Sequence, residues 1–150
     1  MITGEKTSNN SIGRLEIVVP KNAIDANGHV NNVQYVQWMQ DAALVHSASL
    51  GWPLSRYAAL GCTWFVRSHT IEYFHACYAG ELIWVDTWVA NFQRIKSLRK
   101  FRFFRPTDKN QLAKASTLFV FCDSKSRKPT SIPPEVLRDY PIVASAQEPK

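Results

Sequence analysis

One uninterrupted helical stretch limits the folds that this chain can adopt. Residues 33–50 contain neither glycine nor proline. Several apolar residues of the stretch recur near one face of a helix: Val36, Met39, Ala43 and Leu50. Asn31 or Asn32 can cap the start of the helix, and Gly51 with Pro53 can end it. The sequence therefore predicts one long helix.

Extended segments surround this helix. A short β-type run at residues 15–19 stops at Pro20, and residues 21–32 have the Asn, Asp and Gly content of a loop. After the helix we expect a loop at residues 52–61. Four segments rich in aromatic and β-branched residues follow, at residues 63–74, 82–92, 97–105 and 112–123. The turn residues between them predict a meander of antiparallel neighbours, and residues 135–139 can form a single helical turn.

This order of elements indicates an α+β fold in which an antiparallel five-stranded sheet wraps around one long central helix. The 150 residues are enough for one domain, with an ordered core at about residues 14–140 and loose ends. Trp84, Asp86 and Trp88 alternate with inward-facing apolar residues on strand 82–92. Both sheet faces therefore carry large apolar groups, and we expect the second face to meet another subunit in a homodimer or homotetramer.

Composition narrows the cellular context and the cofactors. No basic residues precede an apolar run at the start of the chain, and no apolar stretch approaches spanning length. The three cysteines, Cys62, Cys77 and Cys122, form no C-x-x-C pair. We expect a cytoplasmic protein without a membrane span, disulfide framework, metal or nucleotide cofactor.

Positive charge is concentrated in one stretch of the sequence, although the formal net charge of the whole chain is only +6. The basic residues of this stretch are Arg94, Lys96, Arg99, Lys100, Arg102, Arg105 and Lys109. Such a ribbon attracts nucleic acid, a membrane surface or the phosphates of a substrate, or it is a solvated, charged hairpin edge. No helix-turn-helix, zinc-finger or RNP motif accompanies it, so nucleic acid is not the expected partner.

The loop before the helix concentrates groups that can do chemistry. Residues 25–35 read Asp-Ala-Asn-Gly-His-Val-Asn-Asn-Val-Gln-Tyr. Gly28 permits a tight turn, and the helix start offers unpaired backbone N–H groups and the positive end of its dipole. A thioester carbonyl could be polarised there by the N–H of Asn32, while Asp25 activates water or attacks the acyl carbon and His29 assists. The alternative interpretation is that Asp25 and the asparagines only cap the helix.

This loop and the helix that follows resemble the 4-hydroxybenzoyl-CoA thioesterase-like family of hot-dog fold acyl-CoA thioesterases. The resemblance rests on D-x-N-G-H-V-N-N-x-x-Y at residues 25–35, with Trp38, Met39 and Gln40 after it. The D-x-N-x-H spacing and the His-Thr-Ile-Glu-Tyr string at residues 69–73 are similar to plant acyl-ACP thioesterases. Lys-Pro at residues 128–129 and Ile-Pro-Pro-Glu at residues 132–135 look like the usual end of family members.

The resemblance implies roles for particular residues. Asp25 falls on the catalytic aspartate of the hydroxybenzoyl-CoA enzymes, Asn27 and His29 on the asparagine and histidine of the plant enzymes, and the N–H of Asn32 on the carbonyl donor. Gln40 stands where several relatives carry an acid that faces the substrate, and Ala76 where the plant enzymes carry a further glutamate.

Substrate-binding residues are also implied. These are Tyr35, Gln40 and His69 near the acyl group, and Arg94, Lys96 and Arg99 at the coenzyme A phosphates. The expected activity is hydrolysis of an acyl-CoA thioester without a cofactor. The alternatives are an acyl-ACP thioesterase, a hot-dog hydratase or dehydratase, and a non-catalytic protein that binds acyl-CoA or nucleic acid.

Overall fold

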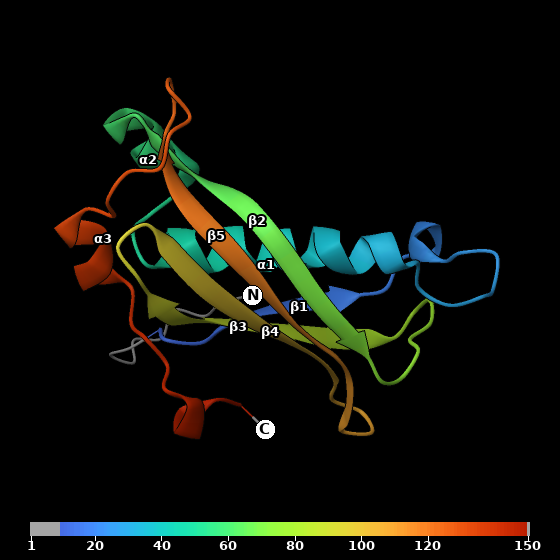
Figure 1. Ribbon diagram of the computed structural model, residues 1–150. Helices are drawn as coiled ribbons and strands as arrows, with labels where there is room; N and C mark the ends of the chain where they lie inside the picture. The colour runs from blue at the N-terminus through green and yellow to red at the C-terminus, as the bar shows by residue number, and fades with distance from the viewer. Residues whose placement is uncertain (1–9, 150) are drawn as a thin grey trace.

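The computed structural model describes residues 10–149, and its strands form one antiparallel sheet that curves around a long helix (Figure 1). The strands are β1 (Gly13–Val18), β2 (Cys62–Tyr73), β3 (Leu82–Phe92), β4 (Lys96–Arg105) and β5 (Asn110–Asp123). The helices are η1 (Lys21–Ala23), α1 (Asn32–Ser49), α2 (Leu54–Leu60), α3 (Pro134–Asp139) and η2 (Ser145–Gln147). The α+β hot-dog architecture expected from the sequence is confirmed.

The long helix α1 begins where the sequence predicted. The side-chain oxygen of Asn31 accepts a hydrogen bond from the N–H of Val33 at 2.8 Å, so Asn31 is the cap. The buried face differs from the expected one: it comprises Tyr35, Trp38, Met39, Ala42 and His46. Val36, Ala43 and Leu50 are only partly buried. The prediction had weighted aliphatic residues, whereas two aromatic rings and an imidazole occupy most of the face that the sheet covers.

The order of strands in the sheet is β1-β3-β4-β5-β2, which corrects the expected meander. β3, β4 and β5 are sequential neighbours, but β2 pairs with β5 at one edge and β3 pairs with β1. Residues 74–81 between β2 and β3 are therefore a crossover connection and not a hairpin turn. Turn residues mark where a strand ends, but they do not specify which strand lies beside it.

Residues 52–61 are not the loop that we expected. Pro53 precedes the seven-residue helix α2, and Gly61, with φ of 73°, ends it. A helix of two turns is too short to show a clear hydrophobic period. The ring of Tyr57 in α2 packs on Trp52, with 4.8 Å between ring centroids, so α2 covers one end of the core.

Residues 142–148, which we expected to be loose, are docked on the sheet. The backbone N–H of Val143 donates to the carbonyl of Val89 at 3.0 Å, which continues the β1 side of β3. Farther along, Glu148 accepts from the indole of Trp88 at 3.3 Å and pairs with Lys100 at 2.8 Å. This segment therefore covers part of the outer face of the sheet.

Charged side chains cover another part of the same outer face. Arg14 pairs with Asp86 at 2.7 Å and lies over the ring of Trp84, and Arg102 pairs with Asp86 at 3.1 Å. Asp86 is thus fully buried between two arginines. The sequence predicts that another subunit covers the apolar groups of β3 on this face, but this chain itself covers much of β3.

No helix within residues 10–149 combines the length and the apolar character needed to cross a bilayer.

Candidate active site

The loop before α1 closes on itself. The N–H of Asp25 donates to the carbonyl of His29 at 2.9 Å, and the N–H of Gly28 donates to the carbonyl of Asp25 at 3.1 Å. Gly28 has φ of 87°, the left-handed conformation that the sequence predicted for it. On either side of this turn, Ile24 and Val30 form an antiparallel bridge. The turn therefore has a fixed shape that determines where the carboxylate of Asp25 lies.

The carboxylate of Asp25 is not a helix cap. Its Oδ1 accepts the N–H of Asn27 at 2.8 Å, which is an Asx turn within the loop. Its Oδ2 lies 3.9 Å from Nδ1 of His29, and 23% of the side chain is exposed. Because Asn31 caps the helix, capping does not explain the aspartate. The predicted acid and imidazole are neighbours at a surface that solvent can reach.

At the start of α1, one backbone N–H group is available to bind a ligand. The N–H of Asn31 donates to the carbonyl of Ala23, and the N–H groups of Val33 and Gln34 both bond to Asn31. The N–H of Asn32 has no hydrogen-bond partner among residues 10–149. It lies at the positive end of a long helix, where a negatively charged oxygen is stabilised.

A small cavity of about 220 Å³ lies beside this helix start. Its lining residues are His29, Val30, Asn32, Tyr35, Tyr73, Phe74, His75 and Ala76. Asp25 and Asn27 are not part of the lining. Tyr35 is almost fully buried, its hydroxyl lies 3.3 Å from Sγ of Cys77, and burial raises its pKa. Tyr35 therefore forms a wall of this cavity and does not supply an ionised group.

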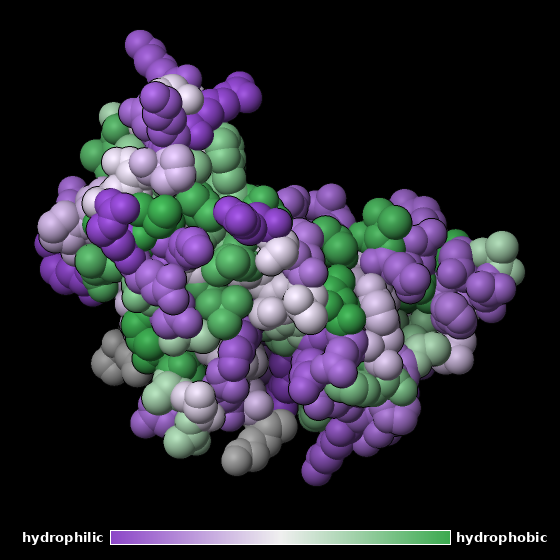
Figure 2. Space-filling view, viewed as in Figure 1, coloured by the Kyte–Doolittle hydropathy of each residue, from purple (hydrophilic) through white to green (hydrophobic). Residues whose placement is uncertain are grey.

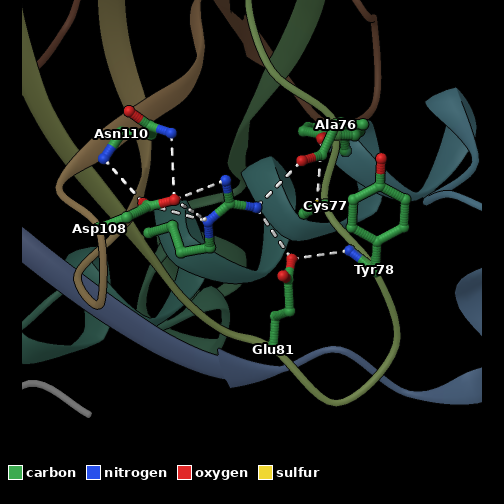
Figure 3. Close-up of polar contacts among 8 residues, drawn as sticks. Ala76, Cys77, Tyr78, Glu81, Asp108 and Asn110 are labelled. Carbon is green, nitrogen blue, oxygen red and sulfur yellow. Dashed lines mark hydrogen bonds and ion pairs between the residues drawn. The ribbon is translucent and has the colours of Figure 1, made fainter.

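Residues 76–81 contact the Asp25 loop and are themselves held by a network of polar contacts with residues 108–110 (Figure 3). The carbonyl of Cys77 accepts the N–H of Val30 at 3.0 Å. The preceding carbonyl, of Ala76, accepts from the guanidinium of Arg105 at 3.1 Å, and the same guanidinium pairs with Glu81 at 3.0 Å and with Asp108. Sequence reasoning missed this network because its members are far apart in the chain. Arg105 had been assigned to the basic ribbon.

Two predicted substrate residues lie elsewhere. Gln40 is exposed on α1 and borders a second, larger cavity. His69 on β2 is partly buried, and its Nδ1 is hydrogen-bonded to Oγ1 of Thr117 at 2.8 Å. Burial lowers the pKa of His69. Neither residue lines the small cavity at the helix start.

The basic ribbon is not a continuous cationic surface. Arg94 is exposed in the β3–β4 connection and donates to Oγ of Ser131 at 3.1 Å, and Lys96 begins β4. Lys100, Arg102 and Arg105 form ion pairs with acids of the same chain. Arg99 is 5% exposed and points to the inner side of the sheet. Arg94 and Lys96 therefore remain candidates for the predicted phosphate site. Arg99 does not, because side chains alternate between the two faces along β4 and Arg99 lies on the inner face.

The larger cavity, of about 450 Å³, was not predicted. Its lining residues come from the second half of α1, from α2 and from the inner face of the sheet. In Figure 1, α2 lies at the end of α1 that is away from the Asp25 loop. The walls of the cavity are mainly aromatic and aliphatic, with Arg99 and the hydroxyls of Ser47, Tyr57 and Tyr140 among the polar groups. Tyr140 is hydrogen-bonded to Ser47 and, at 2.7 Å, to Tyr57.

Comparison with known proteins places the chain in a family. The family model of the thioesterase-like superfamily matches residues 19–139, which is most of the chain. The chain therefore belongs to the thioesterase-like superfamily. No curated protein sequence matches it.

Solved structures share the fold at low sequence identity. The 1,4-dihydroxy-2-naphthoyl-CoA thioesterase of Synechocystis has a TM-score of 0.79 at 18% identity, covering 85% of this chain and 94% of that one. The DHNA-CoA thioesterase of Staphylococcus aureus has a TM-score of 0.79 at 21% identity, covering 85% and 87%. An acyl-ACP thioesterase of Bacteroides thetaiotaomicron has a TM-score of 0.80 at 22% identity, covering 94% of this chain but only 58% of that one. This chain thus spans little more than half of the acyl-ACP enzyme.

Proposed function

We propose that this protein hydrolyses an acyl thioester at the start of α1, with the carboxylate of Asp25 performing the chemistry. The observation that carries the proposal is the N–H of Asn32, which has no hydrogen-bond partner among residues 10–149 and lies near a solvent-accessible carboxylate that does not cap the helix. Membership of the thioesterase-like superfamily supports the same reaction.

The proposed reaction uses groups on one loop and one helix end. The thioester carbonyl accepts a hydrogen bond from the N–H of Asn32, so that the developing oxyanion is stabilised by that N–H and by the helix dipole. Asp25 either removes a proton from water as the water attacks the acyl carbon, or attacks that carbon itself. The bond from carbon to sulfur then breaks, and the thiolate is protonated and leaves as the thiol. Where Asp25 itself has attacked, water then hydrolyses the acyl-aspartyl anhydride, which releases the acid and restores the carboxylate. His29, 3.9 Å from Asp25, can carry that proton.

For the substrate, we propose an acyl group on coenzyme A or on an acyl carrier protein. Both carriers end in a phosphate-bearing arm. Arg94 and Lys96 at the β3–β4 connection are the candidate phosphate contacts, because Arg94 is exposed and has no ion pair among residues 10–149. We also propose that Asn27 and Tyr35 position the reacting groups, the former through its N–H bond to Asp25.

The test compares Asp25→Asn with Asp41→Asn. An asparagine at position 25 keeps an oxygen that can accept the N–H of Asn27, so the loop should retain its shape. Asp41 lies on α1, where it accepts a hydrogen bond from Gln37, and it is the matched control for an acid-to-amide change. Free-thiol release from aromatic and straight-chain acyl-CoA esters should fall by about a hundredfold or more in the first variant only.

Two results would contradict the proposal. One is full turnover in Asp25→Asn, and the other is an equal loss in both variants. Circular dichroism of each variant checks that the fold is intact. Because a hydratase releases no thiol, the same assay also separates hydrolysis from hydration of the thioester.

A further inference from the structure

Arg99 is a buried cation for which the described part of the chain supplies no acidic partner. Only 5% of its surface is exposed, and none of the acids in residues 10–149 forms an ion pair with it. Arginine is almost never this deeply buried unless its charge is paired, since removing a cation from water carries a large desolvation cost. Burial lowers the pKa of Arg99 only to about 10, so the guanidinium keeps its charge at neutral pH.

The contacts of Arg99 leave hydrogen-bond donors unused. Nη1 donates to Nδ1 of His46 at 2.9 Å and to Oγ1 of Thr87 at 3.1 Å. Because Nδ1 of His46 is an acceptor, the imidazole proton is on Nε2, which donates to the carbonyl of Asn10 at 2.6 Å. His46 is therefore neutral and supplies no negative charge. The Nε and Nη2 donors of Arg99 have no partner within residues 10–149.

The cavity that Arg99 lines is otherwise suited to an apolar molecule. Its walls include Trp52, Trp64, Val89, Phe92 and Phe119. At its rim, Leu44, Leu54 and Val66 are exposed. Figure 2 shows hydrophobic residues gathered on the side of the molecule where α2 and α3 lie. The volume of about 450 Å³ is within the range of small-molecule sites.

We propose that this cavity binds an apolar molecule that ends in a carboxylate, with the carboxylate on the guanidinium of Arg99. The fork of guanidinium donors matches the two oxygens of a carboxylate, and the bound anion would supply the missing counter-charge. Two sources share this chemistry. One is a free medium-chain or aromatic acid. The other is the distal carboxylate of a dicarboxylic acyl thioester whose chain is long enough to span the roughly 22 Å of α1 between Asn32 and Ser47, and this source rests on the proposed hydrolase function.

The first experiment measures binding by isothermal titration calorimetry and requires no turnover. Wild-type protein should bind decanoate about tenfold or more tightly than decan-1-ol, which has the same chain without the charge. Arg99→Gln should remove that preference, and Arg99→Lys should keep part of it. Arg127→Gln removes the same charge from an exposed position outside the cavity and should behave as wild type. The comparison of acid with alcohol on wild-type protein stands even if Arg99→Gln fails to fold.

The second experiment separates the two sources. Arg99→Gln should lower kcat/KM for octadecanedioyl-CoA, whose chain can span the length of α1, by tenfold or more relative to octadecanoyl-CoA if the substrate supplies the carboxylate. If Arg99→Gln changes kcat/KM equally for both esters, and decanoate binding still depends on Arg99, the site is assigned to a free acid. If no ester is turned over but decanoate binding depends on Arg99, the result contradicts the proposed hydrolase function and supports the proposed carboxylate site. Failure to bind decanoate, or equal affinity for decanoate and decan-1-ol, overturns the inference.

Discussion

His46 has no exposed surface, and its two ring nitrogens are both used in hydrogen bonds. Gly13 lies so close that a Cβ there would be 2.8 Å from the imidazole ring, so a larger residue at position 13 would clash with the ring where it lies. Burial, with a smaller contribution from the charge of Arg99, lowers the pKa of His46 to about 4 from 6.5. The residue is therefore neutral in the folded protein under conditions in which an unfolded chain would already protonate it.

This difference predicts that the free energy of unfolding decreases as the pH is lowered. Above pH 6.5 neither state protonates His46, and between about 6.5 and 4 only the unfolded state binds the proton. The free energy of unfolding should decrease by roughly 2 kcal/mol from pH 7 to pH 5 through this residue alone. Urea unfolding of wild type and of His46→Gln at both pH values measures the effect. Parallel losses in the two proteins would contradict it.

The residues of the loop could be predicted from the sequence, whereas Arg99 could not. Asp25, Gly28 and Asn31 are close in the chain, and the residue type of each predicts its local role: Asp25 as an acid, Gly28 in a turn and Asn31 as a helix cap. Arg99 was assigned to a surface ribbon because neighbouring charges suggested a solvated edge. One signal pointed inward: Phe101 and Phe103 follow Arg99 at two-residue spacing, and all three share a strand face.

At the scale of elements, the number and kind of strands followed from local composition, but their neighbours did not. β2 lies beside β5, about fifty positions later in the chain, and that pairing depends on how the crossover at residues 74–81 passes the end of the sheet. The C-terminal segment after α3 was also misjudged. It contains no periodic pattern that predicts a helix or strand, yet the backbone hydrogen bond to Val89 and the burial of Val143 attach it to the sheet.

Adjacent residues of this C-terminal segment offer a matched test of its docking. Val143 is 4% exposed and Ile142 is 47% exposed. Val143→Asp would bury a carboxylate without a partner and should lower the free energy of unfolding by roughly 3 kcal/mol. Ile142→Asp should change it by about 0.5 kcal/mol or less. Urea unfolding of both variants measures this, and similar small effects would mean that the segment is not docked.

At the scale of the whole molecule, β2 leaves one edge of the sheet unpaired within the described residues. Several large apolar side chains on and beside this strand are exposed: Phe65, Val66, Tyr73 and Phe74. A long, apolar strand edge is a site of association unless another chain covers it. We therefore keep the proposal of a homodimer or homotetramer, but place the contact at β2 and not on the outer face of β3.

Light scattering tests this placement. Wild-type protein should have a mass of at least twice 17.1 kDa. Phe65→Glu puts a charge on β2 and should shift the protein toward the monomer at micromolar concentration. Tyr78→Glu is the control, because Tyr78 is similarly exposed but lies in the crossover, away from the strand edge. A monomeric wild type, or the same shift in both variants, would contradict the placement.

The position of the two cavities along α1 has an evolutionary consequence. The N–H of Asn32, which is unpaired among residues 10–149, and the cavity at Ser47 are separated by about 22 Å of rigid helix. Substitutions around Ser47, Trp64 or Arg99 can therefore accumulate without altering the turn that holds Asp25. A lineage with this layout can change the ligands that it accepts in small steps while the chemistry of the loop is inherited intact.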